Sequence, residues 1–234
     1  MVAKIVGLLG ELLLTAGVLV GLFAFYLLYW TGMETAKVQA EAKDELRQAW
    51  QQPAPAAPAA PIPDLAVQHT SGTGVALLSA PKAGIYELVA FEGVDQATLA
   101  GGPGHYPGTA LPGQVGNAAF AAHRDGHGAP FDNIDRLGTC DDIYVETREA
   151  IYTYKVLPLD AQGGRGEDFH CAPEGIEIPE IAGQHIVTPD QSQVIDPVGG
   201  AALLTWTTCH PQWDNSHRLI IHAVLAHTEV KEMV

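Results

Sequence analysis

The chain has 234 residues, enough for one ordinary domain with attached segments. It carries 12 lysines and arginines against 27 aspartates and glutamates, so its formal net charge is −15. Binding to nucleic-acid phosphates needs clusters of basic side chains, and the absence of any basic run argues against a nucleic-acid partner. The cysteine count of three is odd, which in an oxidising compartment fits one disulfide and one free thiol.

Residues 1–32 are predicted to form an N-terminal membrane anchor. The segment from Leu12 to Trp30 has no charged side chain. As a helix it would be about 28 Å long, close to the thickness of a hydrocarbon core. Aromatic residues gather at its C-terminal end, as in an interfacial belt. A cleaved signal peptide is the alternative, but its apolar region would be shorter and would end in small residues.

Residues 33–64 are expected to connect the anchor to a folded domain. Met33 to Gln52 is polar and helix-prone, and we interpret it as a solvated juxtamembrane helix with exposed ion pairs. Pro53 to Pro63 contains five prolines and favours an extended polyproline conformation. The predicted order is therefore anchor, spacer and a domain at residues 65–234.

The domain pattern predicts short strands separated by turns. The predicted strands are Ile85–Phe91, Asn117–His123, Ile143–Thr147, Ile151–Leu157 and the runs QHIVTPD, AALLTWTT and RLIIHAVLAH. Only the segments VDQATLAGG and PFDNIDRL look helical. This pattern indicates an all-β domain, either a closed or nearly closed barrel or a sandwich. Asp160 to Gly183 is rich in glycine, proline and acidic residues and is interpreted as a long connecting loop.

A cysteine and an arginine stand at the two ends of one predicted turn. Cys209 ends a strand-like run, and Arg218 opens the next run nine residues later. A thiol near a fixed positive charge is expected to have a lowered pKa, and the thiolate is its reactive form. His123 is the candidate partner, because it ends a predicted strand and precedes a glycine-containing loop. A papain-like protease would have its cysteine first and its histidine far downstream, the reverse of this order.

The motifs around these residues make the chain resemble a sortase, the membrane-anchored cysteine transpeptidase of Gram-positive bacteria. Class E, typical of actinobacteria, is the most similar class. The resemblance spans about residues 78–227 and rests on GPGHYPGTALPGQVGN, HRDGHGAPF, TWTTCHP and HRLIIHA. It implies a closed eight-stranded β-barrel with short helices and a catalytic site of His123, Cys209 and Arg218. It also implies that the enzyme needs no metal and no organic cofactor.

The resemblance further implies the reaction and its partners. The Cys209 thiolate would attack the Thr–Gly carbonyl of an LPxTG- or LAxTG-type C-terminal sorting signal on a secreted protein. Arg218 would stabilise the oxyanion and His123 would protonate the leaving amine. The acceptor would be an amine such as that of a lipid II cross-bridge precursor. The catalytic domain would be extracellular on a single-pass anchor with a cytoplasmic N-terminus. A pilus-polymerising sortase and an inactive peptide-binding barrel are the alternatives.

Four further residues are candidate substrate contacts. Thr207 and Thr208 belong to the TWTTC run, in which Trp206 replaces the leucine usual in the family. His105 and Tyr106 lie in a loop that resembles family residues near the substrate groove, and packing of a tight Gly/Pro loop is an equal alternative for them. Four other histidines are expected to be non-catalytic: His127, His210, His217 and His222.

Cys140 and Cys171 form a candidate disulfide. Cys140 stands where the family pattern has a turn glycine, and Cys171 lies in the long acidic loop. An extracellular location would permit a bridge, and closing a loop of this length stabilises a fold by roughly 3–4 kcal/mol. The bridge would pin the loop to the barrel near the substrate groove. Two unrelated buried thiols are the alternative.

Overall fold

The structure, a computed structural model, describes residues 2–26, 30–52, 72–159, 169–171, 174–176, 178 and 180–232. The proline-rich spacer, Pro53 to Pro63, and the predicted domain start near Leu65 lie outside these residues. Much of the predicted long loop, including residues 160–168, also lies outside them.

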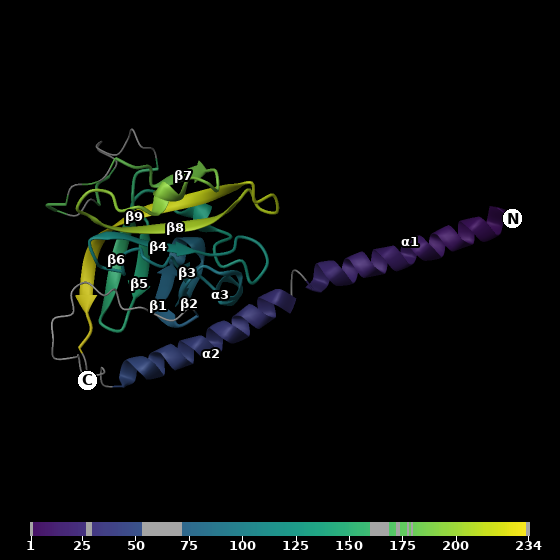
Figure 1. The fold of residues 1–234 in the computed structure, drawn as a ribbon, viewed down its shortest axis with the longest axis horizontal. Helices are drawn as coiled ribbons and strands as arrows, with labels where there is room; N and C mark the ends of the chain where they lie inside the picture. Colours follow the sequence, from purple (N-terminus) through teal and green to yellow (C-terminus); the bar gives the residue numbers. More distant parts are fainter. Residues whose placement is uncertain are drawn as a thin grey trace.

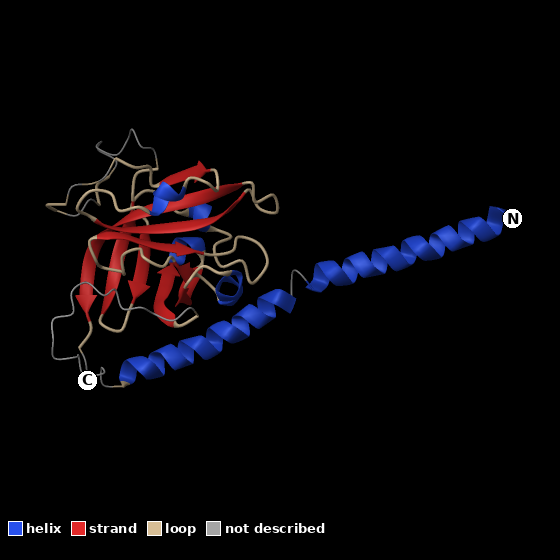
Figure 2. Cartoon of the chain, viewed as in Figure 1, coloured by secondary structure: helices blue, strands red, loops and turns tan. Residues whose placement is uncertain are grey.

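Within the described residues, strands dominate the folded domain (Figures 1 and 2). They are β1 (Gly74–Ala80), β2 (Ile85–Glu92), β3 (Gly104–His105), β4 (Gly116–Ala121), β5 (Asp142–Glu146), β6 (Ala150–Val156), β7 (Gln184–Val187), β8 (Ala202–His210) and β9 (His217–Val230). The short helical elements are α3 (Gln96–Gly101), η2 (Pro81–Ala83), η3 (Ile134–Arg136) and η4 (Ser192–Ile195). The two segments predicted to be helical contain α3 and η3.

Eight of these strands close into a barrel in the order β6-β5-β1-β2-β3-β4-β8-β9, because β9 pairs with β6 as well as with β8. The long strand β9 has β8 along one edge. On its other edge β7 pairs with residues 218–221 and β6 pairs with residues 223–230. The predicted closed eight-stranded β-barrel is confirmed, and β7 is an additional strand at the same edge as β6.

The barrel interior is filled by apolar side chains that alternate with outward-facing ones along each strand. Trp206 is fully buried in this core and stacks on Phe131, with ring centroids 4.6 Å apart. Trp206 lies three residues before Cys209 in β8, so alternation puts the two side chains on opposite faces of the strand. The tryptophan that replaces the family leucine therefore packs in the core.

The N-terminal helix α1 (Val2–Phe25) extends away from the barrel (Figure 1). Its segment Lys4–Phe25 is long and apolar enough to cross a membrane, and none of that segment is buried in the protein. The apolar helix thus starts before the predicted span at Leu12 and includes Glu11. Its length and composition suit a membrane anchor.

The next helix, α2 (Thr31–Gln51), packs along the barrel beside β1, β2 and α3 (Figure 1). The expectation of a solvated juxtamembrane helix is therefore wrong. Residues spaced three or four apart form the contacting stripe: Thr35, Gln39, Ala42, Leu46 and Trp50. Leu46 is buried in a small apolar cluster with Leu77, Val89 and Phe91.

Polar side chains make much of the α2 contact. The Gln39 side-chain amide donates to the carbonyls of Val89 (3.0 Å) and Gly101 (2.8 Å), and its oxygen accepts from the Val89 N–H at 2.7 Å. Lys43 and Arg47 both form ion pairs with Glu87. A helix that docks through such groups has no clear apolar stripe, which is why its sequence suggested a solvated face.

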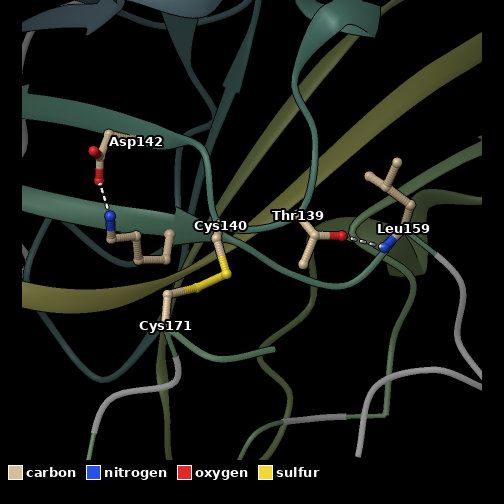
Figure 3. Close-up of a disulfide and its surroundings, with 6 residues drawn as sticks. Thr139, Cys140, Asp142, Leu159 and Cys171 are labelled. Carbon is tan, nitrogen blue, oxygen red and sulfur yellow. Dashed lines mark hydrogen bonds and ion pairs between the residues drawn. A yellow bond between two sulfur atoms is a disulfide. The ribbon is translucent and has the colours of Figure 1, made fainter. Parts of the chain in front are cut away.

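Cys140 and Cys171 are joined by a disulfide, with their Cα atoms 5.8 Å apart (Figure 3). Cys140 has a φ of +69°, the left-handed conformation that a turn glycine would supply. The bridge packs against an apolar cluster that includes Leu203 near the start of β8. Cys209 lies six residues further along that strand, about 20 Å away at the rise of a strand. The bridge thus fastens the loop to the end of the barrel opposite Cys209.

Candidate active site

The sheet topology brings His123, Cys209 and Arg218 to one end of the barrel. Strands β4 and β8 are parallel, with Ala121 opposite Thr207, so both chains leave the sheet at the same edge. The pairing continues past β4, because the Ala122 N–H donates to the Thr207 carbonyl at 3.2 Å. His123, the next residue, therefore lies beside the end of β8. Strand β4 ends at Ala121 rather than at His123 as predicted.

Cys209 and Arg218 are directly opposite each other in the antiparallel β8–β9 pair. Both Cα positions lie at the barrel edge where β4 ends, since residue 207 of β8 pairs with residue 121 of β4. Cys209 is half-buried and is a free thiol. The arrangement thus puts a thiol, an imidazole and a guanidinium at one end of the barrel, although His123 is far from the other two in sequence.

Burial raises the pKa of the Cys209 thiol above its ordinary value. The positive charge of Arg218 lowers this pKa, and the negative charge of Asp125 raises it, but burial has the largest effect. The expectation of a lowered pKa is therefore wrong in direction. That expectation considered the positive charge of Arg218, but the sequence does not show that the thiol is partly removed from water.

Burial lowers the pKa of His123, and the neighbouring His127 lowers it further, while Asp125 raises it. The His123 ring stacks on that of His127 with centroids 4.9 Å apart. Its Nε2 atom is buried without a hydrogen-bond partner among the described residues. At neutral pH the resting site thus favours a neutral imidazole beside a neutral thiol.

Arg218 directs its guanidinium to the β8–β9 turn. Its Nη1 atom donates to the carbonyls of Asn215 (3.0 Å) and His217 (2.8 Å). A guanidinium has five N–H groups on three nitrogens, so these bonds from Nη1 do not use its full donor capacity. Arg218 thus braces the turn that follows Cys209 while keeping its charge close to the thiol.

The loop after His123 and the turn after Cys209 are fastened to each other. Asp125 accepts a 2.8 Å hydrogen bond from the N–H of Trp213, and the Gln212 side chain donates to the Arg124 carbonyl at 3.3 Å. The buried Arg124 side chain donates to His210 Nδ1 at 2.7 Å. Sequence reasoning missed Arg124 and Asp125, and their position in the HRD run next to the candidate histidine was the available signal.

The four candidate substrate contacts occupy different environments. His105 is buried, and its ring nitrogens contact Glu92 Oε2 at 3.0 Å and the Ala110 carbonyl at 3.0 Å. Both nitrogens are therefore used inside the protein, as the loop-packing alternative requires. The Tyr106 hydroxyl lies 2.9 Å from the hydroxyl of Thr207.

Thr207 and Thr208 are both buried next to Cys209. Alternation puts Thr207 on the same face of β8 as Cys209. Thr208 faces the other way along β8, and its hydroxyl donates to the Ala122 carbonyl at 2.7 Å. Of the four, the Tyr106–Thr207 pair lies on the Cys209 face, whereas Thr208 helps to fix the segment leading to His123.

A family model described as a sortase domain matches residues 78–226. A Streptomyces coelicolor protein named sortase SrtE2 is 30% identical over 242 residues, covering 97% of this chain and 84% of that protein. The matched region contains the whole site described above.

Solved structures show the same similarity. The SrtF sortase from Corynebacterium diphtheriae superposes with a TM-score of 0.61 at 34% identity, covering 73% of this chain and 93% of that one. Sortase E1 from Streptomyces coelicolor, solved with a tripeptide in its active site, gives a TM-score of 0.54 at 28% identity. That alignment covers 68% of this chain and 91% of the other.

Proposed function

The chain belongs to the sortase family of cysteine transpeptidases, and from that premise we propose its substrates and the roles of its residues. It cleaves an LPxTG- or LAxTG-type sorting signal at the C-terminus of a secreted protein, between threonine and glycine. It then transfers that protein to an amine of a cell-wall precursor, such as a lipid II cross-bridge. The observation that carries the proposal is the convergence of His123, Cys209 and Arg218 at one barrel edge.

Cys209 is the nucleophile and His123 is its proton acceptor. The thiol gives its proton to the imidazole, and the sulfur forms a bond to the threonine carbonyl carbon. Arg218 stabilises the oxyanion with its charge and N–H groups. The C–N bond then breaks as His123 gives the proton to the leaving glycine amine.

The second half of the reaction reverses these roles. The acceptor amine attacks the Cys209 thioester and loses a proton to His123, which returns it to the departing sulfur. The product is a new peptide bond, and the thiol is restored. The neutral thiol and imidazole favoured by burial are therefore the forms that the cycle begins and ends with.

The architecture supports catalysis at a membrane surface. We propose an anchor at residues 1–32, a connecting segment at 33–64 and a catalytic domain at 65–234, with α2 lying on that domain. The domain is extracellular and the N-terminus cytoplasmic, as substrate secretion requires. The tripeptide in the active site of sortase E1 supports a peptide substrate for this chain as well.

A peptide panel tests the proposal. The full-length enzyme is incubated with peptides carrying proline or alanine at the second signal position, with and without a glycine amine, and the products are identified by mass spectrometry. We expect peptide joined to the amine after cleavage between threonine and glycine, with alanine accepted at least as well as proline. Cys209→Ala is the control. Cleavage at another bond would contradict the proposed signal. A clear preference for proline would keep the LPxTG form of the signal but contradict the resemblance to class E.

A further inference from the structure

The loop that follows His123 contains an unusual left-handed turn. Four successive residues have positive φ values: Gly126 (+62°), His127 (+45°), Gly128 (+72°) and Ala129 (+44°). Glycine adopts this conformation readily, but His127 and Ala129 are strained in it. Such strain persists only where the surrounding structure holds the backbone in place.

Helix α2 touches this turn from outside. The His127 N–H donates to the Thr31 hydroxyl at 3.3 Å, so the first turn of α2 accepts a hydrogen bond from the strained segment. Gly128 packs beside α2, since a Cβ atom there would make an ordinary van der Waals contact with the Thr35 side chain at 3.6 Å. Thr35 is itself buried and donates to the Ala100 carbonyl at 2.9 Å, which fixes this end of the helix on the domain.

The contact is narrow. A cavity of about 330 Å³ borders it on the side of His127, and one of about 500 Å³ borders it on the side of Gly128 and Pro130. Thr35 lines both cavities. Because few contacts connect α2 to the turn at residues 126–129, the loss of one contact should affect the position of the turn.

The left-handed turn supports the proposed catalytic histidine, His123. The His127 ring stacks on His123 at 4.9 Å, and it covers a ring whose Nε2 has no hydrogen-bond partner among the described residues. Helix α2 follows directly after the apolar N-terminal segment. A continuous set of contacts thus runs from the end of that segment through Thr31 and His127 to His123.

We propose that the first turn of α2 is a positioning element of the active site, which holds His127 against His123 through Thr31. Neither Thr31 nor His127 touches the reacting atoms. They act by fixing the orientation and environment of the His123 imidazole. The inference rests on the proposed catalytic role of His123.

The test uses the full-length protein in detergent and two readouts. The first is the titration of the His123 ring followed by NMR, and the second is kcat with a sorting-signal peptide and a glycine amine. The charged groups that shift the His123 pKa are His127 and Asp125 of its own loop. Cys209 and Arg218 are the titratable or charged groups at the facing strand ends.

His127→Asn keeps a residue that tolerates positive φ and removes the ring. We expect the pKa of His123 to rise toward its ordinary value, because a covering ring and a neighbouring positive charge are both lost. Thr31→Val removes the hydroxyl at constant shape. It should lower kcat by about fivefold, the equivalent of one hydrogen bond of ~1 kcal/mol, and move the His123 titration in the same direction. Thr31→Ser should restore both readouts.

Two matched controls separate positioning from stability. Thr15→Val removes a hydroxyl that bonds only within α1, to the Glu11 carbonyl among the contacts described, and should change neither readout. Leu46→Ala loosens the far end of α2 and should lower the melting temperature while leaving the His123 titration in place. If Thr31→Val and His127→Asn both fold and leave the titration and kcat unchanged, the inference is wrong. If Thr31→Val only lowers the melting temperature, α2 merely stabilises the barrel.

These outcomes are distinct from a failure of the proposed function. The His123 titration is measured in the resting protein and needs no substrate. Retained turnover in Cys209→Ala would contradict the function, whereas an unmoved His123 titration would contradict only the positioning by α2.

Discussion

At the residue scale, Cys209 lies between two opposite charges in a partly desolvated position. Arg218 favours its thiolate, while Asp125 and burial favour its thiol. The same Asp125 favours the charged form of His123, against burial and His127. In the proposed mechanism, Asp125 therefore disfavours the nucleophilic thiolate but favours the imidazolium that would protonate the leaving amine.

Removing each charge singly should shift the Cys209 pKa in opposite directions. In the wild-type protein we expect the midpoint of a pH–alkylation profile to lie above the ordinary thiol value of 9.0. Arg218→Gln should raise the midpoint further and Asp125→Asn should lower it, since each removes one charge near the thiol. Iodoacetamide labelling of Cys209 measured across pH provides the profile. Midpoints that move together in the two variants, or a wild-type midpoint near neutrality, would contradict this reading of the site.

The sequence predicted three candidate site residues, which the structure brings to one end of the barrel, but it did not predict the direction of the Cys209 pKa shift. Cys209 and Arg218 flank one turn, so their cross-strand pairing could be expected from the strand pattern alone. Burial depends on how the neighbouring loop covers the strand end. That covering involves Asp125 and Trp213, which come from segments 88 residues apart. No local sequence pattern indicates that Cys209 is buried in this way.

At the scale of elements, a buried polar network ties β4, β8 and β9 together. Thr205 donates to the Asn117 side-chain oxygen at 2.7 Å, so His222 Nδ1, 2.8 Å from the same hydroxyl, must donate to it. The Asn117 side-chain amide donates in turn to the carbonyls of Val194 and Asp196 around η4. The network thus requires a proton on Nδ1 of His222, and burial favours the neutral form of this ring.

The burial of His222 makes the fold sensitive to acid. Burial, followed by the nearby His185, lowers the pKa of His222 from 6.5 to about 3. Below pH 6.5 the unfolded chain binds a proton that the folded chain binds only near pH 3. The contribution of neutral His222 to the free energy of unfolding is therefore fully present above pH 6.5. It is lost as the pH falls toward 3, by up to about 1.4 kcal/mol per pH unit.

Denaturant unfolding between pH 7.5 and 4 would measure this loss. His222→Gln retains an N–H donor and does not titrate, so its stability should fall less steeply with decreasing pH than that of the wild type. The comparison is between slopes, so a lower absolute stability of the variant does not affect it. Equal slopes in the two proteins would show that His222 is not the buried base responsible.

The Cys140–Cys171 bridge fastens the segment around Phe169 to the start of β5. We expect alkylation of the folded, unreduced protein to label Cys209 alone and alkylation after reduction and unfolding to label all three cysteines. Because the bridge packs at the end of the barrel opposite Cys209, Cys140→Ala with Cys171→Ala should lower the melting temperature with little change in kcat. Mass spectrometry counts the labels. Labelling of Cys140 or Cys171 without reductant would refute the bridge.

At the scale of the whole molecule, the barrel and α2 form one packed unit next to the apolar helix α1 (Figure 1). Near the C-terminal end of α2, Trp50 lies under the Lys231 ammonium group at 4.2 Å from its ring centroid. At the N-terminal end, Thr31 accepts a hydrogen bond from the His127 N–H. The helix thus contacts the domain at both ends, so the orientation of the barrel relative to α2 is fixed by many separate interactions.

Much of the barrel could be predicted from the sequence. The β5–β6 hairpin has alternating apolar and polar positions, and β8 and β9 contain continuous runs of residues typical of buried strands. The docking of α2 could not be predicted in the same way. Its stripe includes Thr35 and Gln39, whose partners are backbone carbonyls, and backbone carbonyls leave no trace in a sequence.

The central claim is that Cys209 forms a thioester with the substrate, and intact-mass spectrometry of the enzyme tests it most directly. The protein is mixed with a sorting-signal peptide without an added amine, quenched in acid and digested to locate the adduct. The account predicts a mass increase equal to the peptide acyl group ending in threonine, located on Cys209, and its disappearance when a glycine amine is added. No such adduct should form in Cys209→Ala. An acyl group on another residue, or peptide cleavage that continues in Cys209→Ala, would contradict the account.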